Sequence, residues 1–435
     1  MSRILLKKNL LKIILLILFI LFIGSIVFTK HIPRYWIIGK FLKTHIPENL
    51  YSIVKVIYDN KRMTKRLLND YNTTFLPETQ FLSLTLTKNP IDIFPQEENK
   101  NVRYFNALGP SGRQSFYLDR YEDKIILINL AGETYYKKIN KIVENKEQFT
   151  QIKNNLKLSY PLDIFIKNKN IYVSGVKEKF DNCKFLVLKK GIINSDNINF
   201  NTIFESNECM KDVRSGKIQS LKLNNEDFIL LSTSADVLLN NEIDLKPQDD
   251  KTIFGKILII NEKNNTYEIF SKGHRNILGL YSDNNIILST ENGPRGGDEI
   301  NKIIKNKNYG WQIASYGETY ASLWVPKENN DYHKSHENFG FEEPLYSFVP
   351  SIGISEIIKI DNNFSKKWQD NYLIGSLNYR HILRVKFDNN YNRLIFSEKI
   401  FIGERIRDLL YVPKEKIILL ALEDSGSLGI LSLKK

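Results

Sequence analysis

Histidine and cysteine are scarce in this sequence, and no nucleic-acid-binding pattern is present. The chain has six histidines and two cysteines among 435 residues. Its formal net charge of +13 comes from lysines scattered among asparagines and isoleucines. Because they form no basic stripe, we interpret them as a lysine-rich surface and expect no nucleic-acid partner. Low-complexity tracts are also missing. The 42% of hydrophobic residues suffice for a folded core, and the length suits two or three average domains or one large all-β domain.

One long apolar run lies near the N-terminus. Residues 13–28 are apolar except for Gly24 and Ser25, which is close to the roughly 20 residues that a bilayer-spanning helix needs. Basic residues before the run favour a cytoplasmic N-terminus, with the rest of the chain outside. Because no A-x-A-like cleavage site follows, we expect residues 1–30 to be an uncleaved single-pass anchor in the inner membrane; a removed signal peptide is the alternative. The main domain would then face the periplasm or the cell exterior.

A short helix is expected after the anchor. Within residues 47–72, apolar side chains recur at helical spacing, so residues 31–75 are predicted to form a juxtamembrane helical segment. Beyond it the helical period largely disappears. We therefore assign residues 76–435 to one all-β domain.

A recurring sequence pattern, which we call a phrase, organises this domain. Each copy is an alternating apolar stretch, a polar turn and a second apolar run, which is typical of a β-hairpin. Copies begin at Ser115, Leu162, Ile218, Ile277, Ile354 and Ile406. One hairpin plus two further strands per interval makes a four-stranded sheet, and such sheets repeated around an axis form a propeller. The fold class is therefore predicted to be a six-bladed β-propeller, with residues 321–344 as an insertion.

The two cysteines flank two apolar runs that we expect to pair. Cys183 and Cys209 lie at similar distances from a turn-like NSDN stretch at residues 194–197. A hairpin about this turn would place them opposite each other, which favours a disulfide in an exported chain. Two unrelated thiols are the alternative.

Six specific motifs follow one another in the second half of the chain. In order they are GHRNILGL, ENGPRGGDEINKI, NYGWQIASYGETY, EEPLYSFVPSIGISE, NYLIGSL and GERIRDLLYVP. Together they resemble the quinoprotein glucose/sorbosone dehydrogenase family, which includes the aldose sugar dehydrogenases. The resemblance is strong from Gly273 to Asp424 and weaker before that. It implies a six-bladed propeller that uses pyrroloquinoline quinone (PQQ) and calcium to oxidise sugars outside the cytoplasm.

The resemblance assigns four residues to the quinone. Arg275 and Asn276 of GHRN match quinone contacts, although both could instead cap a turn. Arg405 and Arg407 of GERIRD also match cofactor contacts. At positions i and i+2 of a strand they would point to the same face, where two guanidinium groups suit a ligand with several carboxylates. Packing beside Glu404 or Asp408 is the alternative for this pair.

The glycine-rich motif supplies the implied metal and substrate positions. Gly293 and Pro294 match residues whose backbone carbonyls hold the calcium ion, and calcium takes oxygen ligands. Asp298 matches a pocket carboxylate near the substrate, and Phe348 stands where a tryptophan is common. Asn378 stands where relatives carry a quinone-contacting lysine.

The clearest departure concerns the general base. Aligning SGKI with the family pattern places Val213 where the family has the histidine that takes a proton from the sugar. Valine cannot accept a proton, and losing a general base typically costs about 100- to 10,000-fold in rate. No histidine lies between His45 and His274, so a small shift of the alignment does not restore one.

The other histidines offer little compensation. His381 is the only credible replacement base, and it or Arg380 could also substitute for the missing lysine. His333 and His336 have the spacing of a metal site, but without a nearby cysteine or carboxylate cluster we interpret them as loop histidines.

Two hypotheses follow from these departures. The first is a membrane-anchored PQQ-dependent sugar dehydrogenase with an altered base. The second is a non-catalytic propeller that acts as a ligand-binding or protein-interaction module beside the membrane. The fold alone does not decide between them.

Overall fold

The structure is a computed structural model that describes residues 82–93, 114–144, 147–179, 183–194, 197–235, 245–283, 286–318 and 332–434. The predicted membrane anchor and juxtamembrane segment, residues 1–30 and 31–75, lie outside the described residues. Within the described part, no helix has both the length and the apolar composition to span a bilayer.

Six antiparallel sheets form the blades of a propeller. Blade 1 contains β2 (Phe116–Tyr121), β3 (Lys124–Asn129), β4 (Thr134–Lys138) and β5 (Thr150–Asn154), with the two-residue β9 (Asn197–Ile198) parallel to β5. The short helix α4 (Ile139–Val143) follows β4. Blade 2 contains β6 (Tyr160–Lys167), β7 (Asn170–Glu178), β8 (Lys184–Ile192) and β10 (Asn201–Glu205). Blade 3 contains β11 (Ile218–Leu223), β12 (Glu226–Ser232), β13 (Lys256–Asn261) and β14 (Thr266–Lys272).

The remaining three blades come from the second half of the chain. Blade 4 contains β15 (Ile277–Ser282), β16 (Ile287–Glu291), β17 (Asp298–Lys302) and β18 (Tyr346–Phe348). Blade 5 contains β19 (Ile354–Ile360), β20 (Asn371–Ser376), β21 (His381–Phe387) and β22 (Leu394–Phe401). Blade 6 contains β23 (Ile406–Val412), β24 (Ile417–Leu422), β25 (Ser427–Leu433) and β1 (Leu84–Pro90). The predicted six-bladed β-propeller is therefore confirmed.

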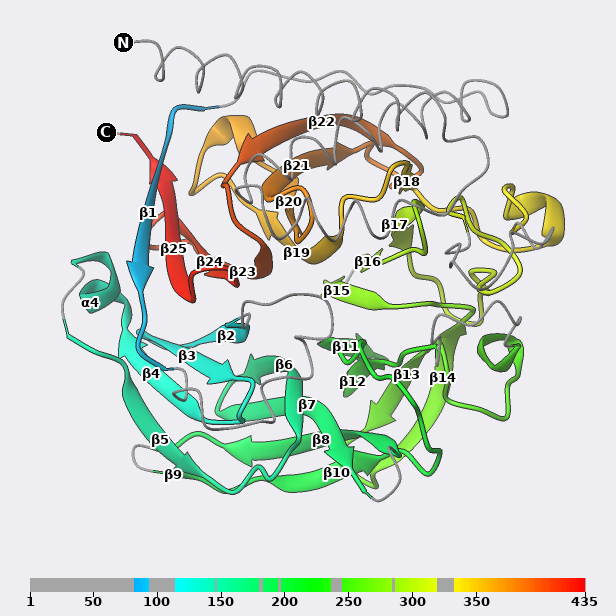
Figure 1. The fold of residues 1–435 in the computed structure, drawn as a ribbon, viewed down its shortest axis with the longest axis horizontal. Coiled ribbons are helices and arrows are strands. Elements are labelled where there is room, and N and C mark those ends of the chain that lie inside the picture. Colours follow the sequence, from blue (N-terminus) through cyan, green and yellow to red (C-terminus); the bar gives the residue numbers. More distant parts are fainter. Residues whose placement is uncertain are drawn as a thin grey trace, which may run out of the picture. The chain divides into compact units, whose positions relative to one another are not determined.

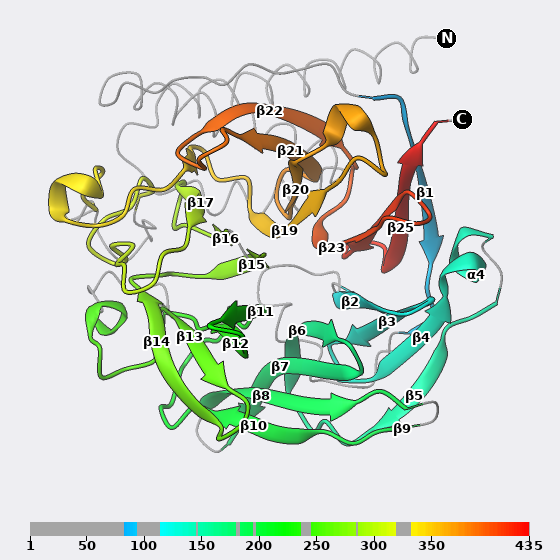
Figure 2. The same ribbon diagram turned by 180° about the vertical axis from the view of Figure 1, so that it is seen from behind.

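The first strands of the blades lie around the middle of the molecule (Figures 1 and 2). These inner strands are β2, β6, β11, β15, β19 and β23, and each contacts the inner strands on both sides, with β23 returning to β2. Each begins within two residues of one predicted phrase. The ring closes because β1 pairs along all seven of its residues with β25, from Leu84 opposite Leu433 to Pro90 opposite Ser427. The sequence did not predict this closing strand.

The apolar core is divided among the blade interfaces. Strand residues alternate between two faces, so each blade presents apolar side chains to both neighbours. Six buried clusters result, one between each pair of adjacent blades.

Four aspartates, all buried except the half-buried Asp119, join neighbouring blades through the backbone. In each case a carboxylate oxygen accepts an N–H from the inner strand of the next blade: Asp119 from Ile166 (2.5 Å), Asp163 from Ile218 (2.8 Å), Asp298 from Ile354 (2.9 Å) and Asp408 from Leu118 (2.9 Å). Because an amide and a carboxylate form a strong hydrogen bond when shielded from water, these contacts fix the alignment of adjacent inner strands.

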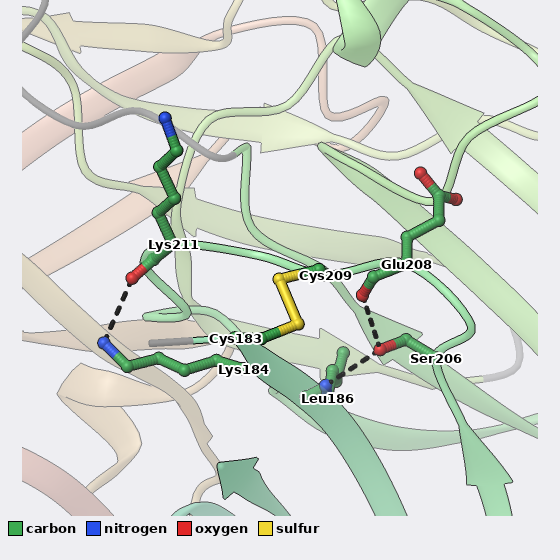
Figure 3. Close-up of a disulfide and its surroundings, with 7 residues drawn as sticks. All are labelled: Cys183, Lys184, Leu186, Ser206, Glu208, Cys209 and Lys211. Atoms are coloured by element: carbon green, nitrogen blue, oxygen red, sulfur yellow. Dashed lines mark hydrogen bonds between the residues drawn. A yellow bond between two sulfur atoms is a disulfide. The ribbon is translucent and has the colours of Figure 1, made fainter. Parts of the chain in front are cut away.

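The predicted disulfide is confirmed. Cys183 and Cys209 are bonded, with their Cα atoms 5.2 Å apart. Figure 3 shows the bond beside Lys184, whose Nζ donates to the Lys211 carbonyl oxygen at 3.0 Å. Strands β8 and β10 pair antiparallel between the two cysteines, so the bond closes the open end of the predicted hairpin.

Candidate functional site

The predicted site residues occupy one face of the propeller. They lie at the beginnings of the inner strands β15 and β23, at the start of β17, at the end of β18, or in the loops β16–β17 and β20–β21. Strands within a blade are antiparallel, so the start of the first strand, the end of the second and the start of the third meet at the same edge. We call this side the strand-start face. It contains Arg275, Asn276, Gly293, Pro294, Asp298, Phe348, Asn378, Arg405 and Arg407.

A buried histidine supports the GHRN turn. His274 is fully buried and stacks on Tyr309, with ring centroids 4.6 Å apart. Its Nδ1 lies 3.1 Å from Glu291 Oε2 and its Nε2 lies 2.9 Å from Ser271 Oγ. This serine–histidine–glutamate order matches a hydrolase triad. However, Ser271 is only 1% exposed, so no substrate reaches its hydroxyl and we assign the three residues a structural role.

The side chain of Arg275 lies on the glycine-rich loop. We call residues 292–297, between β16 and β17, the glycine loop. Arg275 is 7% exposed, and its Nη1 donates to the backbone oxygens of Asn292 (2.7 Å) and Gly293 (2.8 Å). The Trp311 ring centroid lies 5.2 Å from the guanidinium carbon, a cation–π distance. Arg275 therefore does more than cap a turn: its charge is held against loop carbonyls.

Asp298 holds the same loop in place through hydrogen bonds. It is fully buried, and its Oδ1 accepts the Gly293 backbone N–H at 3.0 Å and the Asn292 amide at 3.3 Å. Burial raises the pKa of Asp298, although the N–H donors around it counteract this. A Cβ on Gly293 would collide with the Gly297 carbonyl, so glycine is required for the tight return of the chain. The predicted substrate contact of Asp298 stays a prediction.

Arg405 and Arg407 share a buried carboxylate that was not predicted. Arg405 Nε donates to Glu423 Oε2 at 2.8 Å, and Arg407 Nε donates to Glu423 Oε1 at 2.5 Å. Burial alone would raise the pKa of Glu423, but the two guanidinium groups lower it to about 2. The partner is therefore neither Glu404 nor Asp408. Glu423 thus holds both guanidinium groups together at the strand-start face.

The remaining predicted positions are held by backbone or apolar contacts. Asn378 donates its backbone N–H to the Ile352 carbonyl at 3.1 Å. Phe348 is 9% exposed and packs in the cluster between blades 4 and 5. His381 lies beside them at the start of β21, with Nδ1 3.2 Å from the Tyr379 carbonyl oxygen.

The position of the family base is part of the apolar core. Val213 is 1% exposed and belongs to the cluster between blades 2 and 3. An imidazole at this backbone position would be surrounded by apolar side chains. His333 and His336 also have separate environments: His333 is exposed and stacks on Phe339, whereas His336 Nε2 lies 3.7 Å from Glu299 Oε1. Among the described residues, no three metal-ligating side chains gather at one point.

A buried charge cluster at the inner strands was missed by sequence reasoning. Lys217 Nζ forms ion pairs with Asp163 Oδ1, at 2.5 Å, and with Glu356 Oε2, and it lies 5.5 Å from the ring centroid of Tyr117. Asp408 completes the cluster, since its charge contributes to the pKa shifts of Asp163, Lys217 and Glu356. We call Lys217, Asp163, Glu356 and Asp408 the axial cluster.

The axial cluster has more acids than bases. Burial raises the pKa of Glu356 to about 8 and that of Asp163 to about 6, even though Lys217 lowers both. The carboxylates conversely raise the pKa of Lys217 against the effect of burial. One sequence signal could have revealed the cluster. Single acidic residues interrupt the apolar inner strands in LDIF, ISEI and IRDLL.

Comparisons with known proteins agree with this arrangement. A family model described as "Glucose / Sorbosone dehydrogenase" matches residues 158–430. The chain is 31% identical to aldose sugar dehydrogenase YliI of Escherichia coli over 173 residues, which cover 39% of this chain and 45% of that protein. The chain spans about half the length, or less, of the curated relatives it matches.

Solved structures share the fold at lower identity. The soluble aldose sugar dehydrogenase of Escherichia coli in its apo-form is similar with a TM-score of 0.61 and 18% identity, over 74% of this chain and 96% of that one. The PQQ-bound form of aldose sugar dehydrogenase from Streptomyces coelicolor gives a TM-score of 0.57 and 13% identity, over 83% of this chain and 100% of that one.

Proposed function

The chain belongs to the glucose/sorbosone dehydrogenase family, and on that premise we propose that it binds PQQ at the strand-start face and oxidises an aldose there. The observation that carries this proposal is the pair Arg405 and Arg407, whose guanidinium groups are held together by the buried Glu423 at the strand-start face. A ligand with three carboxylates and a quinone suits such a face.

Arg275 adds a second positive group to this face. Its Nε is buried without a hydrogen-bond partner among the described residues, so the guanidinium retains an unused donor. PQQ, when bound, supplies a quinone that accepts two electrons from the sugar. The residues of this chain bind and orient its carboxylates, while Asn276 and Asn378 offer neutral amides from the neighbouring loops.

This chemistry also requires a group that accepts a proton from the sugar, and the residue at the family's position cannot do so. Val213 offers none, and His381 is the one described histidine at the start of a strand beside the predicted quinone positions. We therefore expect turnover well below that of a family member with its histidine base, by about 100-fold or more.

A non-catalytic propeller is the second candidate. It is favoured by the burial of Val213 in the apolar cluster between blades 2 and 3. In that case the strand-start face would bind an anionic ligand or a protein partner without oxidising a sugar.

A membrane location is also part of the proposal. The apolar residues 13–28 support a single-pass anchor in the inner membrane, and the Cys183–Cys209 disulfide suits an oxidising compartment such as the periplasm. Alkaline extraction of membranes tests this: the full chain should stay in the pellet, and a chain without residues 1–30 should not.

The binding experiment uses full-length protein purified in detergent. We expect PQQ to bind in an absorbance titration and an artificial acceptor to be reduced slowly in the presence of aldoses. The variant Arg407→Gln should bind PQQ about tenfold more weakly, whereas Arg393→Ala, on an exposed turn, should match the wild type. Absence of PQQ binding by the wild type would contradict the proposal and favour the non-catalytic candidate. Turnover equal to that of a relative with its histidine would contradict the missing-base argument.

A further inference from the structure

We propose that the guanidinium of Arg275 is the resident cation of the glycine loop, and that this site binds its quinone ligand without calcium. The part of this inference that concerns the quinone ligand rests on the proposed function. The part that concerns the cation rests only on the geometry of the glycine loop. It departs from what the family resemblance predicts for Gly293 and Pro294.

The loop carbonyls already have a positively charged partner. Nη1 of Arg275 donates to Asn292 O at 2.7 Å and Gly293 O at 2.8 Å, and it lies 3.4 Å from Asn292 Oδ1. Three oxygens thus converge on one nitrogen. Gly293 O is one of the two carbonyls predicted to hold calcium, so the cation position is taken by a side chain of the protein.

Calcium does not fit beside this side chain. The ion needs six to eight oxygens at about 2.3–2.6 Å. An ion bound to Gly293 O would therefore lie within a few ångströms of the Arg275 charge, where repulsion is strong in a poorly hydrated site.

The nearby carboxylates do not compensate for that repulsion. Asp298 Oδ1 accepts N–H groups of Gly293 and Asn292. Glu291 contacts the His274 ring and accepts the Arg275 backbone N–H. Both acids therefore serve N–H donors of the loop and its support rather than the carbonyls that face Arg275.

Arg275 is fixed in this position. Its backbone N–H donates to Glu291, and its carbonyl accepts the Ala235 N–H at 2.9 Å. Trp311 covers the guanidinium, and only 7% of the residue is exposed. The backbone contacts fix where the side chain begins, and moving the guanidinium away would break its bonds to Asn292 O and Gly293 O and its contact with Trp311, whereas a buried charge without partners is strongly unfavourable.

The exchange of a divalent ion for a guanidinium changes what the site can do. A guanidinium is planar, carries a single delocalised charge and donates in fixed directions. It can therefore pair with a carboxylate or quinone oxygen, but it polarises that oxygen less than a divalent ion does. Ligand binding would be independent of calcium, and chelators would not release the ligand.

The first test measures the cation directly and needs no quinone. Chelator-treated full-length protein is titrated with CaCl₂ by calorimetry and with TbCl₃ by luminescence excited through tryptophan. Because Trp311 covers Arg275, terbium in the glycine loop would be sensitised by it. We expect no saturable calcium binding and no sensitised terbium signal in the wild type. A saturable sensitised terbium signal in the wild type that is lost in Trp311→Phe would overturn the proposal.

The variant Arg275→Ala provides the complementary result. Removing the guanidinium frees the carbonyls of Asn292 and Gly293, so a sensitised terbium signal should appear. That signal should disappear again in Arg275→Ala/Trp311→Phe. Arg393→Ala serves as the control for loss of an arginine, and thermal unfolding checks that each variant is folded. If folded Arg275→Ala binds terbium no better than the wild type, the guanidinium is not what excludes the ion, and the proposal fails.

The second test measures PQQ affinity with EDTA and with excess CaCl₂. Wild-type affinity should agree within twofold between the two conditions. Arg275→Ala should bind at least tenfold more weakly in EDTA and recover part of this loss in calcium. A tenfold gain of wild-type affinity in calcium would overturn the proposal. If PQQ binds in neither condition, the proposed function fails, and the calcium and terbium titrations still decide the resident cation.

Discussion

The glycine loop and the axial cluster both bury a cation against oxygen atoms, but the two cations differ in what surrounds them. Arg275 faces neutral backbone carbonyls, so its positive charge is not cancelled. Lys217 faces Asp163 and Glu356 with Asp408 nearby, so its charge is exceeded by that of its neighbours. The comparison indicates that the surrounding charge, rather than the presence of a basic residue, separates a binding position from a structural one. The group of Arg405, Arg407 and Glu423 is intermediate in this respect, because two guanidinium groups share one carboxylate.

The largest effect is expected from Lys217→Met. It would leave three buried acidic side chains without their ammonium group, and breaking a buried ion pair typically costs about 3–5 kcal/mol. Urea unfolding at neutral pH measures the loss. Lys263→Met is the matched control, because Lys263 pairs with Glu226 at the exposed surface and should change stability by less than about 1 kcal/mol. Equal effects of the two variants would show that the axial cluster does not depend on its cation.

A somewhat smaller effect is expected from Glu423→Gln. Both arginines would lose their shared carboxylate, but Arg405 is 14% exposed, so solvent should compensate in part and the loss should be about 2–3 kcal/mol. The positive charge at the strand-start face would rise by one, and PQQ should bind more tightly at low salt. A titration that shows weaker binding by a folded variant would place the pair in a structural role like that of Lys217.

The pH dependence of stability tests the excess of acids in the axial cluster. Burial raises the pKa of Glu356 from 4.5 to about 8, so the folded protein keeps a proton that the unfolded chain releases. The contribution of this group to stability is therefore full below pH 4.5 and is lost as the pH rises to about 8, by at most about 1.4 kcal/mol per pH unit. Glu356→Gln should flatten the stability profile in this range, whereas Glu226→Gln, at an exposed position, should not. An unchanged slope in Glu356→Gln would contradict the assignment.

The smallest effect on stability is expected from Arg275→Gln. Glutamine keeps one donor for the loop carbonyls, and the lost cation–π contact and charged hydrogen bonds face neutral partners, so we expect about 1 kcal/mol. Ligand affinity should fall far more than stability. A stability loss as large as that of Lys217→Met would remove the distinction between the two regions.

The fold was predictable because the propeller repeats a local pattern. The phrases at Ile218, Ile277 and Ile406 mark the first residues of β11, β15 and β23, since period-two alternation is encoded within each strand. Strand β1 was not predicted because its partner, β25, lies at the other end of the chain, and only pairing across the whole ring defines it.

The position of the candidate site was predictable, but the side chains that pair with its arginines were not. The motifs placed Arg405 and Arg407 on one face, yet Glu423 lies on the far side of a hairpin and nothing near the arginines marks it as their partner. The axial cluster was missed for a related reason. Lys217 and Glu356 are 139 positions apart in the chain, and only the meeting of inner strands from blades 3 and 5 brings them together.

The pairing of the closing strand β1 with β25 has a mechanical consequence. Leu84, at one end of the described propeller, is paired with Leu433, at the other. Tension applied between these two points would break the β1–β25 residue pairs one after another, beginning with Leu84 and Leu433, and so separate β1 from blade 6. The other five sheets would carry little of that force. Ring opening should thus be the first event under load, at lower force than the extraction of any inner strand, which single-molecule pulling from residues 82 and 434 would measure.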